Sequence, residues 1–238
     1  MAKAAWNETR RVVATGNPEV DKKIGGGIPE GSLSLIEGQS DSGKSVLLQQ
    51  LVWGALVENF RIAYYTTENT TRSLLRQMES LGMNIMDHFL LGKLNVYPVP
   101  SALTPEESMT FFSRLLSHIS RQTSYDIIAM DSLTSFVSHV PERDTLTFFT
   151  AIKNICDENK TMLITLHAYA FDESMFIRIR SICDAHLRLR IEEVGDQLVK
   201  VLEVAKVRGA EKSTGNIVSF EVEPGLGMRI VPITKAKA

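Results

Sequence analysis

The chain of 238 residues has a hydrophobic share of 44%, and its 26 lysines and arginines against 28 aspartates and glutamates leave a net charge of −2. This composition excludes extended disorder as the main state and argues against a general attraction to nucleic acid or anionic lipid. The sequence holds two cysteines without a CxxC pattern, and no apolar run approaches the ~18 residues of a membrane span. We therefore expect a soluble, cytoplasmic protein.

Short apolar runs alternate with longer helical patterns through most of the chain. Runs of this first kind predict strands at 32–37, 61–66, 94–99, 125–130 and 161–166. Apolar residues at helical spacing, several with capping residues before them, predict helices at 44–58, 70–81, 105–120 and 145–158. Because these strands lack polar alternation, they are typical of a parallel sheet covered by helices on both faces.

The pattern changes towards the C-terminus. Segment 168–182 is expected to be a loop, and after it short strands separated by Gly, Asp and Pro turns are predicted at 185–191, 199–207, 217–222 and 228–233. No linker-like composition interrupts the chain. We expect residues 1–238 to form one α/β domain, with a mainly parallel central sheet, helices on both faces and a C-terminal antiparallel extension.

One segment matches the phosphate-binding pattern GxxxxGK[ST], and it stands between a predicted strand and a predicted helix, as the motif requires. Its residues are Gly38, Gln39, Ser40, Asp41, Ser42, Gly43, Lys44 and Ser45. In such loops the backbone N–H groups face the phosphates, the lysine reaches the β- and γ-phosphates, and the hydroxyl binds Mg²⁺. We predict that this loop binds Mg-ATP. Asp41 brings a carboxylate close to the phosphates and Ser42 stiffens the loop, so we expect slow turnover.

Three polar residues follow predicted strands at the edge where the loop lies. Asp131 would hold Mg²⁺ through water, or would cap the turn that follows it. Glu68 would polarise the water that attacks the γ-phosphate, or would start a helix, where the dipole favours an acidic residue. His167 would contact the γ-phosphate or would be a hydrogen-bonded structural histidine.

With these motifs in this order, the chain resembles the RecA superfamily and, within it, the KaiC-like branch. The segments TGNPEVD at 15–21 and GGGIPEGS at 25–32 resemble the lead-in to the phosphate loop of that branch, and KVRG at 206–209 resembles its KxRG element. Within the branch, the chain is similar to the ATP-binding accessory proteins of the archaeal flagellum, or archaellum. The resemblance implies a RecA-like P-loop NTPase core.

The resemblance also implies residue roles and partners. Glu68 matches the first catalytic glutamate, but Asn69 stands where a second glutamate is common, which suits weak hydrolysis. Lys206 and Arg208 match residues that reach the nucleotide of a neighbouring subunit. The implied function is a slowly or non-hydrolysing regulatory component of the archaellum motor, forming a nucleotide-dependent hexameric ring. The implied partners are the motor ATPase FlaI and the membrane platform protein FlaJ, with the protein peripheral to the membrane.

Two other functions remain open from the sequence. A DNA-recombination ATPase resembling RadB would need basic loops facing a nucleic acid. The expected loop at 168–182 holds Asp172, Glu173, Arg178 and Arg180, whose charges cancel, so nucleic-acid binding is not expected. A KaiC-like autokinase is the other alternative, and the frequent serines and threonines do not identify a phosphate acceptor.

Overall fold

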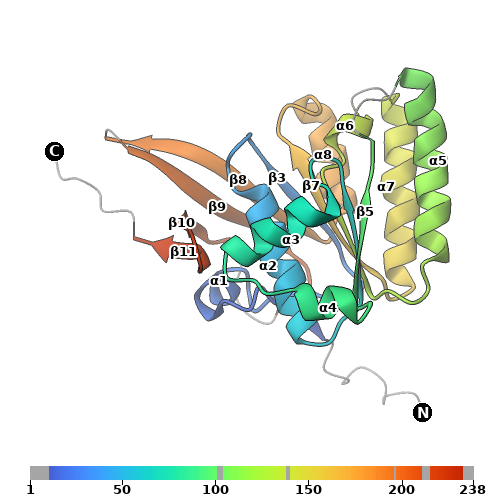
Figure 1. Ribbon diagram of the computed structural model, residues 1–238. Coiled ribbons are helices and arrows are strands. Elements are labelled where there is room, and N and C mark those ends of the chain that lie inside the picture. The colour runs from blue at the N-terminus through green and yellow to red at the C-terminus, as the bar shows by residue number, and fades with distance from the viewer. Residues whose placement is uncertain (1–10, 101–103, 138–139, 196, 211–214, 233–238) are drawn as a thin grey trace, which may run out of the picture.

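The structure, a computed structural model, describes residues 11–100, 104–137, 140–195, 197–210 and 215–232. A nine-stranded sheet with the strand order β11-β10-β9-β8-β3-β7-β6-β4-β5 runs through the molecule (Figure 1). Its strands are β3 (Leu33–Gly38), β4 (Ile62–Thr66), β5 (Leu94–Pro98), β6 (Ile127–Asp131), β7 (Thr161–His167), β8 (Ala185–Val194), β9 (Gln197–Val207), β10 (Ile217–Glu223) and β11 (Gly227–Val231). Strands β1 (Val12–Val13) and β2 (Ile28–Pro29) form a separate antiparallel pair.

Helices cover both faces of this sheet. On one face lie α1 (Pro18–Lys23), α2 (Lys44–Val57), α3 (Thr71–Ser80) and the short α4 (Met86–Leu90). On the other lie α5 (Pro105–Arg121), α6 (Thr134–Val137), α7 (Glu142–Asp157) and α8 (Glu173–Ile182). Buried side chains alternate along the central strands: in β4, Ile62 and Tyr64 join the α2 side of the core and Ala63 and Tyr65 the α5 side. Two apolar faces explain why these strands show no polar alternation in the sequence.

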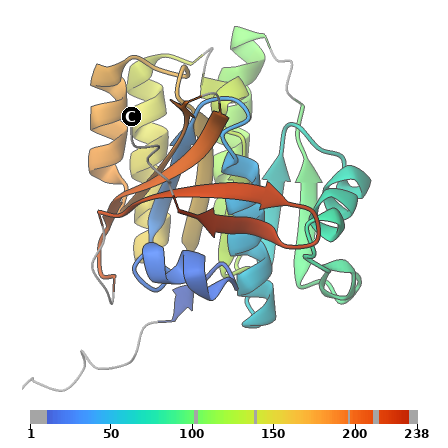
Figure 2. The same ribbon diagram turned by 90° about the vertical axis from the view of Figure 1, so that its left-hand side faces the viewer.

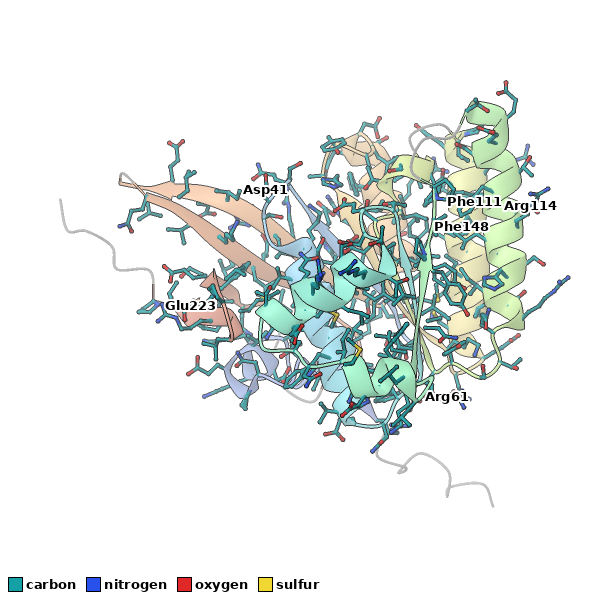
Figure 3. All side chains as sticks on the ribbon, in the orientation of Figure 1. Asp41, Arg61, Phe111, Arg114, Phe148 and Glu223 are labelled. Carbon is teal, nitrogen blue, oxygen red and sulfur yellow. The ribbon has the colours of Figure 1, made fainter. Side chains whose placement is uncertain are left out.

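The register of the parallel strands brings four of their ends to one edge of the sheet. Gly38 of β3 pairs with His167 of β7, and Thr66 of β4 pairs with Asp131 of β6. Figure 3 shows Asp41, three residues past the end of β3, at the edge of the molecule opposite to Arg61, which precedes β4. Crevices at the carboxyl ends of parallel strands are where open α/β sheets bind ligands.

The last strands form the antiparallel extension. β8 pairs with β3 in parallel and with β9 in antiparallel orientation, and β10 and β11 continue the antiparallel order. In Figure 2 the extension crosses in front of α2. Phe220 and Met228 lie in the same buried cluster as the apolar residues of α2. The extension therefore packs against the helix that begins at the phosphate-binding motif.

These observations confirm the predicted fold class: a mainly parallel sheet, helices on both faces and an antiparallel C-terminal extension. The prediction of a loop at 168–182 was wrong for most of this segment, because the helix α8 occupies 173–182. Asp172 caps this helix by accepting from the Met175 N–H, but the alternation in FIRIRSI hides its period. The predicted end of the last strand at Ile233 falls outside the described residues. Among the described helices, none has the length and apolarity to span a bilayer.

Candidate nucleotide-binding site

The phosphate loop, Gly38–Ser45, connects β3 to α2. Gly43 stands at the N-cap of α2 with φ of 97°, and no side chain caps this helix end. The first N–H groups of α2 and its dipole are therefore directed at the loop, an arrangement that favours an anion. A Cβ at Gly38 would lie 2.4 Å from the carbonyl oxygen of Leu189, and one at Gly43 would lie 3.0 Å from the Phe220 ring. The two glycines thus let the extension approach the loop closely.

Lys44 places its ammonium group inside the loop. The residue is 6% exposed, and Nζ donates to the carbonyl oxygen of Gln39 over 2.5 Å and lies 3.5 Å from Nδ1 of His167. Burial lowers the pKa of Lys44, while the carboxylates of Asp131 and Glu68 act in the opposite direction. A phosphate group would offset the desolvation of this cation, so Lys44 fits the predicted phosphate-binding role.

Ser45 and Asp131 form the predicted magnesium pair. The Ser45 hydroxyl donates to Oδ1 of Asp131 over 3.1 Å. Two further hydroxyls donate to the same carboxylate, from Thr165 over 2.8 Å to Oδ1 and from Tyr64 over 3.0 Å to Oδ2. Asp131 is 2% exposed, and burial raises its pKa despite these hydrogen bonds. Carboxylate and hydroxyl oxygens are hard ligands that suit Mg²⁺, and a bound cation would favour the ionised carboxylate, so the pair fits the metal.

Glu68 lies across the same cavity from the loop. Its carboxylate is 51% exposed, and Oε1 is 3.8 Å from Nε2 of His167. The cavity has a volume of about 530 Å³ and is lined by Ser40, Asp41, Gly43, Lys44, Ser45, Val46, Glu68, Gln77, Asp131, Ser132, His167, Lys200 and Val222. The fold thus brings the loop, Glu68 and Asp131 together. A larger hollow of about 810 Å³ adjoins this cavity over β9 and β10, but no residue of the phosphate loop lines it.

Lys200, on β9, is a site residue that the sequence analysis missed. Its ammonium group donates to the carbonyl oxygen of Asp41, a residue with φ of 59°. Asp41 is exposed, so its carboxylate is free to turn away from a phosphate group in the loop, and Lys200 adds a positive charge to the same cavity. Lys200 has no motif around it and only the strand pairing brings it here, so the sequence carried no signal for it. Tyr64 and Thr165 were missed for the same reason, although a threonine within an apolar strand is a weak signal.

Behind the phosphate loop, Glu37 is a buried carboxylate directly before Gly38. It is 1% exposed and accepts from Nε and Nη2 of Arg180 over 2.9 and 2.7 Å, and its Oε2 lies 3.0 Å from Nε2 of His186. Burial would raise the pKa of Glu37, but the hydrogen bonds with His186 and Arg180 outweigh it and hold the pKa at about 2. This ion-pair cluster ties the strand that enters the loop to α8 and β8.

The structure does not bring Lys206 and Arg208 to this cavity. Leu35 of β3 pairs with His186 of β8, and His186 pairs with Lys206, so Lys206 lies away from the loop end of the sheet. Its Nζ donates to the carbonyl oxygen of Arg180 over 2.6 Å. The Arg208 side chain is 57% exposed, and its Nη1 lies 3.6 Å from Oδ1 of Asp184. Their role at the nucleotide of a neighbouring subunit stays a prediction.

Comparison with known proteins agrees with this geometry. The family model described as "ATPase: KaiC" matches residues 13–235. The archaeal flagellar ATP-binding protein FlaH of Sulfolobus acidocaldarius is 33% identical over 230 residues, which cover 95% of this chain and all of that protein. The chain belongs to the FlaH family of KaiC-type ATPases.

A second FlaH protein and a solved FlaH structure support the same assignment, and a further solved structure shares the fold. FlaH of Methanocaldococcus jannaschii is 31% identical over 216 residues, covering 89% of this chain and 91% of that protein. The crystal structure of the flagellar accessory protein FlaH from M. jannaschii matches with a TM-score of 0.78 at 27% identity, over 93% of this chain and all of that one. A KaiC-like protein from Pyrococcus horikoshii shares the fold, with a TM-score of 0.73 over 94% of this chain and all of that one at 22% identity.

Proposed function

We propose that this member of the FlaH family binds Mg-ATP in the cavity of the phosphate loop and acts as a nucleotide-dependent component of the archaellum machinery. Binding of Mg-ATP is supported by one observation: the Lys44 ammonium, the Ser45 hydroxyl and the Asp131 carboxylate all line one cavity. Cation, metal ligands and an uncapped helix N-terminus are the parts that a triphosphate with its magnesium requires. Because one sheet extends from β5 to β11, we take the chain as a single ATP-binding domain.

Each residue has a proposed role in this site. Gly38, Gln39, Ser40, Asp41, Ser42 and Gly43 shape the backbone around the phosphates. Lys44 holds the β- and γ-phosphates and stabilises the charge that develops during hydrolysis. Ser45 and Asp131 would hold Mg²⁺, which would neutralise phosphate charge when bound. Glu68 orients the attacking water. Asn69 carries no carboxylate, which supports slow or absent turnover.

The archaellum role rests on the relatives, which are named as archaeal flagellar ATP-binding proteins. We propose that the chain forms a cytoplasmic ring, a hexamer, against the membrane motor, with FlaI and FlaJ as partners. The placement of Lys206 and Arg208 supports an interface role, because they lie on the extension away from their own phosphate loop. ATP bound between subunits would then set the state of the ring that the motor meets.

Thermal unfolding with and without Mg-ATP tests nucleotide binding. Saturation at about a hundredfold over Kd contributes roughly 2.7 kcal/mol, which for a chain of this size corresponds to a rise in Tm of about 5–11 °C. Lys44→Ala should abolish the rise, whereas Lys22→Ala, an exposed lysine on α1, should keep it. If Lys44→Ala keeps the rise of the parent, the loop is not the phosphate site.

A pull-down from the native cytoplasm, with and without ATP, tests the archaellum role. FlaI should be recovered with the parent protein and lost, or reduced, with Lys44→Ala. Recovery of DNA-repair proteins in its place, with a steep loss of DNA binding as salt rises, would instead support the recombination function.

A further inference from the structure

His167 lies between two site residues of opposite charge. It ends β7, and its ring faces Lys44 on one side and Glu68 on the other. Nδ1 is 3.5 Å from Nζ of Lys44, and Nε2 is 3.8 Å from Oε1 of Glu68. The imidazole therefore lies between the phosphate-binding cation and the carboxylate proposed to orient water, and close to both.

The position of His167 is fixed by its surroundings. Its backbone N–H donates to the hydroxyl of Thr134 over 2.9 Å, and the next N–H, of Ala168, donates to the carbonyl oxygen of Gly38 over 2.9 Å. The ring of Tyr169 lies against the imidazole with a centroid distance of 4.9 Å. The histidine is thus tied to the start of the phosphate loop and held against an aromatic ring.

These neighbours determine the protonation of the ring. An ammonium group has no lone pair, so Nδ1 must face Lys44 with its own lone pair, and the proton of the neutral ring lies on Nε2, towards Glu68. A second proton would place two cations side by side. Burial, followed by the charge of Lys44, lowers the pKa of His167, while Asp131 and Asp41 act in the opposite direction. The ring is therefore neutral at neutral pH, in the Nε2–H form.

We propose that His167 is a positioning residue that holds the Lys44 ammonium through Nδ1 and the Glu68 carboxylate through Nε2–H. Within the described part of the chain, Lys44 has one other hydrogen-bond acceptor, the carbonyl oxygen of Gln39, and the Glu68 carboxylate has no hydrogen bond. Without the imidazole, the half-exposed carboxylate would turn into solvent and the lysine would keep only its hydrogen bond to the loop backbone. The proposal deepens the proposed function and rests on it for the identity of the ligand.

Nitrogen-15 NMR of the full chain without nucleotide tests the proposal independently of ATP. The His167 ring, identified by comparison with His167→Asn, should show one protonated nitrogen, Nε2, at pH 7.5. Glu68→Gln should shift the Nε2 resonance, and Lys44→Ala should shift the Nδ1 resonance. A proton on Nδ1, or a ring whose resonances ignore both substitutions, would overturn the proposal even if ATP binds as proposed.

Calorimetric ATP affinities of His167 variants test the contact with Lys44. His167→Asn keeps an acceptor near Lys44 and should bind ATP within about twofold of the parent, whereas His167→Ala should bind roughly 2- to 10-fold more weakly, as for the loss of one hydrogen bond. In a Lys44→Ala background, titrated at ATP concentrations high enough to reach the weakened site, His167→Ala should cause no further loss. His88→Asn, on α4, is the control and should bind as the parent does. Equal weakening by His167→Ala in both backgrounds would show that the histidine does not act through Lys44, whereas a parent that binds no ATP would instead contradict the proposed function.

Discussion

The hydroxyl of Ser45 donates a hydrogen bond to Oδ1 of Asp131 over 3.1 Å, across 86 residues of sequence. The bond joins the first turn of α2 to the end of β6, next to the phosphate loop. The two side chains therefore lie next to each other in the cavity where we propose that the nucleotide and its magnesium bind.

We predict that Asp131→Asn weakens the magnesium-dependent part of ATP binding. The amide keeps the size of the side chain but supplies no charge to the metal, and a loss of about 10- to 100-fold in metal affinity is expected when such a partner is removed. Titration of ATP with Mg²⁺ and with EDTA measures the effect, which should vanish in EDTA. Asp157→Asn, on the exposed face of α7, is the control. An equal loss in EDTA would indicate damage to the loop in place of a metal role.

Glu68→Gln should separate binding from turnover. The amide retains the size and much of the hydrogen bonding, so ATP affinity should stay within about threefold of the parent, whereas phosphate release should fall to background because the water loses its carboxylate. Glu79→Gln, exposed on α3, should leave both unchanged. The same rate of phosphate release in the parent and in Glu68→Gln would leave Glu68 as a helix-start residue.

The double substitution Lys206→Ala/Arg208→Ala should impair assembly without removing ATP. Both residues lie away from the loop of their own chain, so nucleotide affinity per chain should stay within about threefold of the parent, while the ATP-dependent oligomer is lost because cations supplied in trans no longer meet the γ-phosphate. Native mass spectrometry at equal ATP occupancy measures this. Lys22→Ala/Arg121→Ala changes the charge equally at exposed positions and should assemble normally. Normal assembly of the Lys206/Arg208 variant would show that neither residue takes part in the interface between subunits.

Stability at acid pH should depend on Glu37. Its pKa of about 2 in the folded chain lies below the ordinary value of 4.5. The stabilisation is therefore complete above the unfolded pKa and is lost as the pH falls from about 5 to about 2, a change of roughly 3 kcal/mol. Urea unfolding across this range should show a smaller decline for Glu37→Gln than for the parent, with Glu79→Gln declining as the parent does. Parallel declines in parent and Glu37→Gln would contradict the assignment.

The sequence predicts the parallel core well because burial on both faces leaves a direct record: long apolar runs such as the one before Asp131, each followed by a helical period. It predicts the phosphate loop because spacing alone defines that motif. The sequence did not predict the helix α8, because Ile177 and Ile179 alternate with Arg178 and Arg180, and this alternation matches the period of a strand over a short window. The helix is set by the Asp172 cap and by Phe176 and Ile179 packing against the sheet.

The contents of the site beyond its motifs depend on strand order, which periodicity does not determine. Lys200 reaches Asp41 because β9 follows β8, and β8 pairs with β3. The same dependence places Lys206 opposite His186, away from the loop end of the sheet. A motif fixes what its own residues do, whereas a residue that acts through the sheet is found only once the order of the strands is known.

The contacts of the phosphate loop with Lys200 and Phe220 also determine when, during synthesis of the chain, the pocket is complete. A ribosome makes the phosphate loop early, yet the side chains that close over it come from strands made near the end of the chain. A nascent chain that already displays the complete motif therefore still lacks one wall of its pocket. Nucleotide capture at full strength must wait until β9 and β10 have left the ribosome and paired, so the ligand stabilises the finished chain and does little for its precursors.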